Sequence, residues 1–200
     1  MDLELLKELC DTPGVPGLED KIAKIVQNNI LKLCQSHEID AMGNNIFRVN
    51  KKIEKSPTIL VDAHMDEVGF LVSNIESNGM IRVIALGGID PKLFYGQRLS
   101  IWGKKPIEAT VAAIPPHISN KSDAVTQVED CIIDTGLKYK DVIKFINIGD
   151  QVTFSTKCEI GYDRVLSKAL DDRVGLFVLI EAVKVLRSEE HTSELQSPVT

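Results

Sequence analysis

Apolar side chains recur at helical spacing in three parts of the chain. In residues 1–10 and 18–34 the apolar positions lie three or four residues apart, as on the buried face of an amphipathic helix. The segment 11–17, which holds two prolines and two glycines, separates these two helices. A third helix is predicted after Asp171, with a buried stripe formed by Leu176, Leu179, Val183 and Leu186.

Strand patterns follow the second helix. The runs 58–61 (TILV) and 69–72 (GFLV) are continuously apolar, which predicts strands that are buried on both faces. A further strand is predicted at 46–49, after a Gly-Asn-Asn turn. Helices that alternate with buried strands favour an α/β layer.

Between about residues 73 and 157 the predicted strands are shorter and the turns more frequent. Strands are predicted at 80–85, 98–102, 108–114 and 151–154, with Gly-Gly and Pro-Pro pairs between them, and a helix at 138–146. This pattern is typical of a small β-barrel or sandwich. We therefore expect an α/β domain, formed by 1–72 and 158–186, that is interrupted by an inserted β-barrel domain at 73–157.

The last fourteen residues, 187–200, do not continue the apolar period of the third helix. They read RSEEHTSELQSPVT, which is compatible with a solvated acidic tail. The string also resembles the in-frame translation of a common sequencing-library adapter, and this is the interpretation we favour. On that interpretation 187–200 are a non-native tail, and the natural protein continues past Leu186.

Composition excludes several classes of protein. The 200 residues hold 23 Lys and Arg against 29 Asp and Glu, a net charge of −6, so the chain lacks the basic surface of a nucleic-acid-binding protein. No apolar run approaches the roughly 18 residues of a membrane span. The start of the chain has no signal-peptide pattern and the four cysteines form no C-x-x-C pair, so we expect reduced thiols in a cytoplasmic protein.

A histidine lies among acidic residues at the end of the predicted strand 58–61. Side chains alternate along a strand, so Asp62, His64 and Asp66 would share one side of it. A neutral imidazole is a good ligand for zinc, and a carboxylate two residues on can accept the other N–H of the ring. The motif is short, and a strand end that is merely exposed to solvent is the simpler alternative.

Two adjacent carboxylates, Asp171 and Asp172, open the third predicted helix. The simpler interpretation is an N-cap, because aspartate there stabilises a helix by about 1 kcal/mol. One carboxylate can instead bridge two metal ions. Asp172 would then cap or support the helix, and Arg173 could pair with either carboxylate.

Taken together, these motifs resemble the dinuclear metallo-aminopeptidases, a family that includes glutamyl, deblocking and tetrahedral (TET) aminopeptidases, some of them labelled endoglucanases. The resemblance runs from about residue 3 to 186, and an ordered set of this length is far more specific than either short motif. In chain order it includes PGLE at 16–19, MGNN at 42–45, HMDEVGF at 64–70, GG at 87–88, GQRL at 96–99, PPH at 115–117, DTG at 134–136, IGDQV at 148–152 and KALDDRVG at 168–175.

The resemblance implies an aminopeptidase-like α/β/α sandwich, here truncated, with an inserted β-barrel. It implies hydrolysis of N-terminal residues from short peptides by a water that two divalent ions, zinc or cobalt, activate. His64 would be a ligand of one metal, Asp171 would bridge both, and Asp66 would be the catalytic carboxylate behind His64. A cis peptide is implied between Asp171 and Asp172 in a complete, metal-loaded homologue.

The remaining catalytic parts of that family lie later in its chains. They are a Glu-Glu pair, another acidic ligand and a terminal histidine, and none has a counterpart here. Glu189, Glu190 and His191 fall in the suspect tail and are not assigned. We therefore expect this chain to be inactive and to bind metal weakly or not at all. The full-length family forms homo-oligomers, from dimers to dodecamers.

Three alternatives stay open. A related dinuclear carboxypeptidase or deacylase also uses His-x-Asp and a later Asp, although a β insert placed before that Asp favours the aminopeptidases. A glycoside hydrolase would need two carboxylates and an aromatic platform for the sugar. Only 5% of the residues are aromatic and there is a single Trp, so the case for this alternative is weak. The inserted barrel could also act as a non-enzymatic assembly module.

Overall fold

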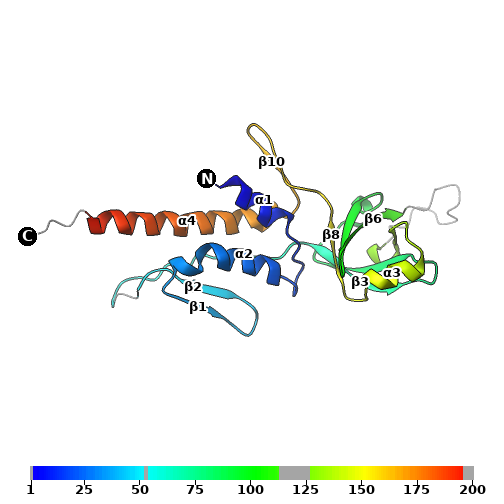
Figure 1. Cartoon of the computed structure of the whole chain (residues 1–200), viewed down its shortest axis with the longest axis horizontal. Helices are drawn as coiled ribbons and strands as arrows, with labels where there is room; N and C mark the ends of the chain where they lie inside the picture. The colour runs from blue at the N-terminus through cyan, green and yellow to red at the C-terminus, as the bar shows by residue number, and fades with distance from the viewer. Residues whose placement is uncertain (1, 52–53, 113–126, 196–200) are drawn as a thin grey trace, which may run out of the picture.

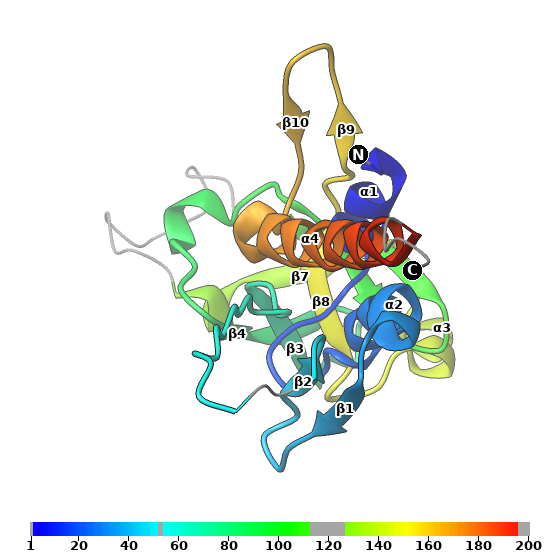
Figure 2. The ribbon, with the colours of Figure 1, turned by 90° about the vertical axis from the view of Figure 1, so that its left-hand side faces the viewer.

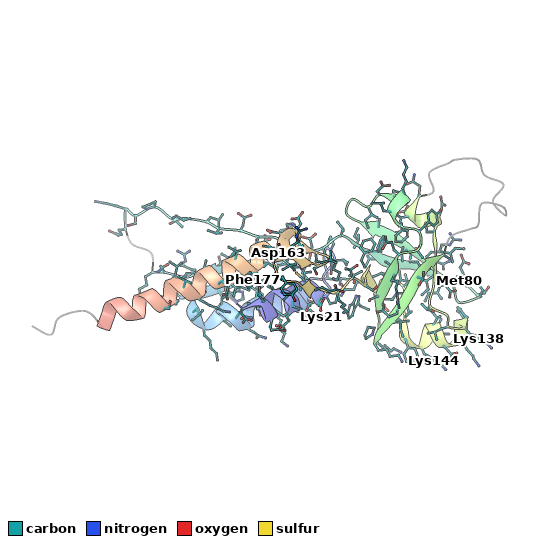
Figure 3. All side chains as sticks on the ribbon, turned by 90° about the horizontal axis from the view of Figure 1, so that it is seen from above. Lys21, Met80, Lys138, Lys144, Asp163 and Phe177 are labelled. Atoms are coloured by element: carbon teal, nitrogen blue, oxygen red, sulfur yellow. The ribbon has the colours of Figure 1, made fainter. Side chains whose placement is uncertain are left out.

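The structure, a computed structural model, describes residues 2–51, 54–112 and 127–195, with the side chains of 189–195 excepted. Figure 1 shows two bodies that lie end to end, a helical body and a barrel. In Figure 3 the side chains also form two groups, with Lys21 and Phe177 in the helical body and Met80, Lys138 and Lys144 around the barrel. The mixed α/β fold with an inserted barrel is therefore confirmed.

The barrel is closed by six strands in the order β3-β4-β7-β6-β5-β8, and every pairing is antiparallel. Closure leaves no exposed sheet edge. A helix, α3 (Tyr139–Phe145), lies within the predicted helical segment. The strands are β3 (Gly69–Ile75), β4 (Ile81–Leu86), β5 (Arg98–Trp102), β6 (Pro106–Ala112), β7 (Ile132–Asp134) and β8 (Gln151–Phe154).

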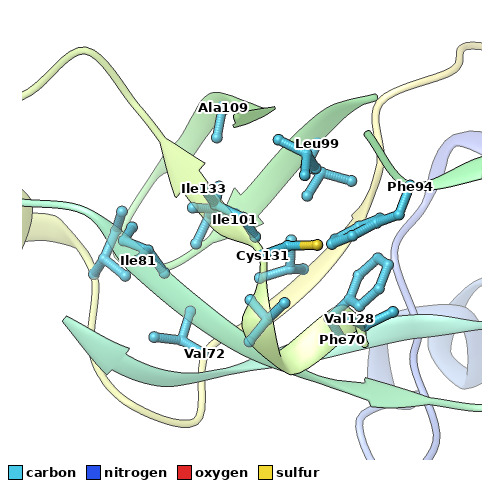
Figure 4. Close-up of a cluster of buried hydrophobic side chains, with 14 of the residues drawn as sticks. Phe70, Val72, Ile81, Phe94, Leu99, Ile101, Ala109, Val128, Cys131 and Ile133 are labelled. Carbon is cyan, nitrogen blue, oxygen red and sulfur yellow. The ribbon is translucent and has the colours of Figure 1, made fainter. Parts of the chain in front are cut away.

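Inward-facing apolar side chains fill the barrel (Figure 4). The rings of Phe70 and Phe94 lie 4.7 Å apart within this core. Alternation along each strand produces this filling, because every second side chain of a small barrel points inward. β3 begins at Gly69, so the run 69–72 belongs to the barrel and not to the α/β layer in which its continuous apolar pattern placed it.

The helical body is built from α1 (Leu3–Asp11), α2 (Asp20–Ile30) and α4 (Leu170–Leu195). Their apolar stripes form a second core, as the helical spacing predicts. A hairpin of β1 (Ser36–Ile39) and β2 (Asn45–Arg48) lies beside α2, and a hairpin of β9 (Glu159–Ile160) and β10 (Val165–Leu166) projects from the body (Figure 2). Short 3-10 turns complete the described elements at Leu31–Leu33, Pro91–Leu93 and Val128–Asp130.

The predicted buried strand 58–61 is not formed. The segment is unpaired, and the side chains of Ile59 and Leu60 are 85% and 83% exposed. A continuous apolar run specifies a buried strand only where neighbouring strands and helices cover it. No strand within the described ranges pairs with 58–61, so the expected sheet of the α/β layer is missing from this body.

Helix α4 continues nine residues past Leu186, where the apolar period was expected to end. Residues 187–195 contain no glycine or proline, and a helix that is already nucleated extends at low cost through such a sequence. In the predicted stripe, Leu176 and Val183 are buried, Leu179 is partly buried and Leu186 is half exposed. None of the helices that the structure describes combines the length and hydrophobicity needed to cross a bilayer.

Candidate metal centre

His64 and Asp171 meet at one end of the helical body, although 107 residues separate them in the chain. The distance between His64 Nε2 and Asp171 Oδ1 is 3.2 Å. His64 follows the extended segment 58–63, and Asp171 lies in the first turn of α4. Both side chains are open to solvent, with exposed fractions of 51% and 97%. The structure therefore brings together the two residues that the sequence indicated as metal ligands.

Asp66 lies on the opposite side of the imidazole ring. Its Oδ1 is 3.2 Å from His64 Nδ1, and its backbone carbonyl oxygen is 3.3 Å from the same nitrogen. Burial by itself lowers the pKa of His64, but the hydrogen bond with Asp171 and the charge of Asp66 outweigh it, so the pKa is raised. One ring nitrogen is thus oriented by Asp66 while the other faces Asp171.

The pair fits part of a metal site. Nitrogen and oxygen ligands lie about 2.0–2.2 Å from zinc, so two ligands that share an ion in tetrahedral geometry are about 3.4 Å apart. The observed 3.2 Å agrees with that spacing, and imidazole plus carboxylate is a donor set that zinc accepts. Over the described ranges, no group of three or more His, Cys, Asp or Glu side chains is gathered for a metal. These residues would therefore offer two ligands and not a closed coordination shell.

A pocket of about 380 Å³ surrounds the pair and reaches the barrel. Asp62, predicted to share a side with His64 and Asp66, is exposed and does not line this pocket. Residues 58–68 pair with no described strand, so no sheet fixes the side to which these side chains point. The pocket is lined by His64, Asp66, Glu67, Val68, Phe154, Lys168, Ala169, Leu170 and Asp171.

The first turn of α4 has an irregular backbone. Asp171 and Asp172 have non-helical dihedral angles, and the peptide bond between them is cis in this chain, whereas the family resemblance implied it for a complete, metal-loaded homologue. Asp172 accepts a hydrogen bond from the backbone N–H of Gly175 through Oδ1 at 3.0 Å. Asp172 therefore caps the helix, as predicted, while the side chain of Asp171 stays free to face His64.

Arg173 does not pair with either aspartate, which corrects the prediction from sequence. Its side chain is fully buried and points away from the pocket toward the end of α1. There it donates to the carbonyl oxygens of Leu9 and Thr12. Its nearest carboxylate is that of Glu67, at 3.8 Å. The guanidinium is directed by burial in the helical body, which the local sequence does not reveal.

A buried ion pair beneath the ligands was missed by sequence reasoning. Lys168 Nζ donates to both carboxylate oxygens of Glu67 at 2.6 Å, and the two side chains are only 7% and 3% exposed. Burial raises the pKa of Glu67 and lowers the pKa of Lys168, while their mutual attraction opposes both shifts. The one available signal was the density of acids around His64, because buried carboxylates need a cation nearby.

Comparisons with known proteins agree on one family of aminopeptidases. The model of the M42 glutamyl aminopeptidase family matches residues 43–200. The chain is 29% identical over 194 residues to the glutamyl aminopeptidase of Lactococcus lactis subsp. cremoris, covering 92% of this chain and 55% of that protein. It is 28% identical to the lysyl aminopeptidase of Pyrococcus furiosus, covering 95% of this chain and 56% of that protein. The chain therefore spans about half the length of the curated relatives it matches.

Solved structures show the same fold. A TET aminopeptidase from a marine-sediment Thaumarchaeota archaeon superposes with a TM-score of 0.86 at 28% identity, over 94% of this chain and 55% of that one. An aminopeptidase from the archaeon Desulfurococcus kamchatkensis superposes with a TM-score of 0.82 at 31% identity, over 91% of this chain and 51% of that one. Since the family model matches well over half of its residues, the chain belongs to the M42 glutamyl aminopeptidase family.

Proposed function

We propose that this chain carries the N-terminal half of the active site of a metal-dependent aminopeptidase. The observation that supports the proposal most directly is the 3.2 Å approach of His64 Nε2 to Asp171 Oδ1 inside a solvent-open pocket. The aminopeptidase names of the relatives give the class of reaction, which is hydrolysis of the N-terminal residue of a short peptide.

Each of the three polar side chains has a separate task in this proposal. His64 presents the lone pair of Nε2 as a ligand, and Asp171 offers two oxygens, so that it can bridge two ions. Asp66 holds the proton on Nδ1 and thereby fixes the tautomer in which Nε2 can bind a cation. Two divalent ions, zinc or cobalt, would lower the pKa of a shared water so that hydroxide forms near neutral pH.

Exposed apolar surface supports the idea that the site is only half present. The side chains of Ile59, Leu60 and Val61 are mostly exposed, as are Val178 and Val185 on α4. Surfaces of this kind are covered in a complete domain, and the relatives are nearly twice as long as this chain. We infer that the natural protein has a further segment that covers them, and that residues 187–200 are a foreign tail. An independent genomic read of the open reading frame tests both points.

The assembly and the partners of the longer protein are a further part of the proposal. The TET1 peptidase of Pyrococcus horikoshii is described as assembling into a tetrahedron or a large octahedral shell. We infer that the longer protein is a cytoplasmic homo-oligomer that acts on short peptides, with neither nucleic acid nor membrane as a partner. Size-exclusion chromatography of the longer protein would measure its oligomeric state.

Metal titration tests the ligand assignment. Addition of Zn²⁺ or Co²⁺ to the purified chain should give weak binding, observed as shifts of the His64 ring resonances. In separate variants, His64→Ala and Asp171→Asn should each weaken binding at least tenfold, because each removes one of only two ligands. Asp163→Asn, a change of an exposed aspartate on the β9–β10 hairpin, is the matched control. Unchanged binding in both site variants would contradict the assignment.

Activity tests the incompleteness of the site. The chain with added metal should not turn over amino-acyl anilides, since two ligands hold two ions poorly and the described residues gather no group of three or more possible ligands. Robust turnover by this chain would refute that expectation. Acylated amino acids and soluble glycans, supplied to the longer protein in parallel, distinguish an aminopeptidase from a deacylase and from a glycoside hydrolase.

A further inference from the structure

Three buried charged side chains lie beneath the candidate metal ligands, and we name Glu67, Lys168 and Arg173 the buried charge cluster. Glu67 is 4% exposed and Arg173 is fully buried, and the side chain of Lys168 is 7% exposed. The roles proposed above for His64, Asp66 and Asp171 do not use this cluster. Burial of three ionisable groups is costly, so a specific arrangement has to compensate it.

Glu67 connects three segments of the chain. Its carboxylate accepts both hydrogen bonds from Lys168, and its Oε1 also accepts from the backbone N–H of Gly14 at 3.3 Å. In return, the backbone N–H of Glu67 donates to the carbonyl oxygen of Gly14 at 2.8 Å. Glu67 is thus held on one side by the loop between α1 and α2 and on the other by the segment that leads into α4.

The ion pair lies at matching positions in the two ligand-bearing segments. Glu67 follows His64 by three residues, and Lys168 precedes Asp171 by three residues. All four side chains line the same pocket. The Glu67–Lys168 pair therefore joins the two segments through buried side chains, whereas their ligands meet in solvent.

The ligands themselves have little packing that could fix their separation. The side chain of His64 is 51% exposed and that of Asp171 is 97% exposed, so few neighbours restrain either one. The two-oxygen contact from Lys168 is short and directional, whereas a buried ion pair adds little net stability compared with an apolar pair of similar volume. The pair is thus better suited to fixing geometry than to adding stability.

We propose that Glu67 and Lys168 are positioning residues that set the separation of His64 and Asp171. The inference rests on the proposed function, in which these two residues share a metal ion. Arg173 anchors the cluster to the end of α1 through the carbonyl oxygen of Thr12 at 3.0 Å. Loss of the pair would let the segment before α4 move relative to His64 while the helical core remained packed.

Two variants and one control separate positioning from stability. Lys168→Met leaves Glu67 buried without its main partner, whereas the double variant Glu67→Gln/Lys168→Met removes both charges of the pair, so that no carboxylate is buried without its lysine. Lys184→Met is the matched control, because Lys184 forms a partly exposed ion pair with Glu181 on α4, at 3.0 Å. Three quantities are measured for each: the thermal midpoint, the ring ¹⁵N resonances of His64 at one fixed pH without metal, and the dissociation constant for Zn²⁺.

The single variant should lower the thermal midpoint and displace the Nε2 resonance of His64, because that nitrogen loses its contact with Asp171. The double variant should recover part of the thermal midpoint, since it leaves no buried carboxylate without its lysine, although Arg173 still loses the Glu67 carboxylate at 3.8 Å. Its Nε2 resonance should nevertheless stay displaced, and Zn²⁺ should bind about 10- to 100-fold more weakly, as for other lost partners of metal ligands. Lys168→Arg keeps donors for Glu67 and should restore the resonance.

A wild-type Nε2 resonance in the double variant would overturn the proposal, because a purely structural role predicts that geometry recovers together with stability. Zn²⁺ binding that both His64→Ala and Asp171→Asn leave unchanged would instead count against the proposed function. The ring resonances of the metal-free chain would still decide whether the pair positions His64, so the two failures can be told apart.

Discussion

Replacement of Arg173 by methionine should destabilise the helical body. The guanidinium is fully buried and donates to two carbonyl oxygens near the end of α1, those of Leu9 and Thr12. Methionine has a similar volume but no donor. Both carbonyl groups would lose their partner, and Glu67 would lose the more distant of its two cations, at 3.8 Å.

The size of the effect follows from two opposing contributions. Two hydrogen bonds from a charged donor contribute about 3–6 kcal/mol in total. Burial of the guanidinium opposes this gain, as the lowered pKa of Arg173 indicates. Two of its nitrogens, Nε and Nη2, have no hydrogen-bond partner among the described residues, so part of the burial cost is uncompensated. We expect a net loss of about 2–4 kcal/mol, a large share of the stability of an ordinary domain.

Urea denaturation followed by circular dichroism at the helical band measures this loss. The variant should unfold at a lower urea concentration with an unchanged slope. Arg164→Met, which alters an exposed arginine on the β9–β10 hairpin, should leave the midpoint unchanged. A midpoint for Arg173→Met equal to that of the unaltered chain would refute the reasoning, because the two backbone contacts would then not exceed the cost of burying the guanidinium.

Three further changes test other parts of the structure. Burial raises the pKa of the Glu67 carboxyl above 4.5, so the folded state binds the carboxyl proton more tightly than the unfolded state does. The stability that this gives is lost as the pH rises from 4.5 through the raised pKa. Urea denaturation over that pH range should show the unaltered chain losing stability relative to Glu67→Gln. Gly103→Ala would press a methyl group against the backbone carbonyl of Phe145 and should cost the barrel about 1–3 kcal/mol, whereas Gly88→Ala, with open space around it, should be silent in the same thermal melt. Asp172→Ala removes the cap of α4 and should cost about 1 kcal/mol, measured by chemical denaturation.

Local patterns in the sequence predicted most of the secondary structure. The helical spacing located α1, α2 and the first half of α4, and the predicted strand at 151–154 coincides with β8. Such elements depend on side-chain period and on turn residues close in sequence, so they can be read without knowledge of the fold. The role of Asp172 as a cap is local in the same sense.

The residues of the candidate site were also predicted, but by a different kind of information. His64 and Asp171 stand out because of their chemistry and because ordered motifs resemble a known family. Spacing alone could not bring them together, since they are 107 positions apart in the chain with a whole barrel between them. The sequence therefore determined which groups can bind a cation, and tertiary structure decided that they meet.

Burial and long-range pairing were decided by the tertiary structure. The apolar run 58–61 has the composition of a buried strand, yet it is exposed because no described strand pairs with it. Arg173 could pair with an adjacent aspartate but reaches the end of α1 instead, and Lys168 finds Glu67 across 101 residues. The sequence by itself determines the period and the chemistry of the side chains. The free energy of a buried charge or of an apolar strand depends instead on the distant groups that surround it, and only the folded chain determines those neighbours.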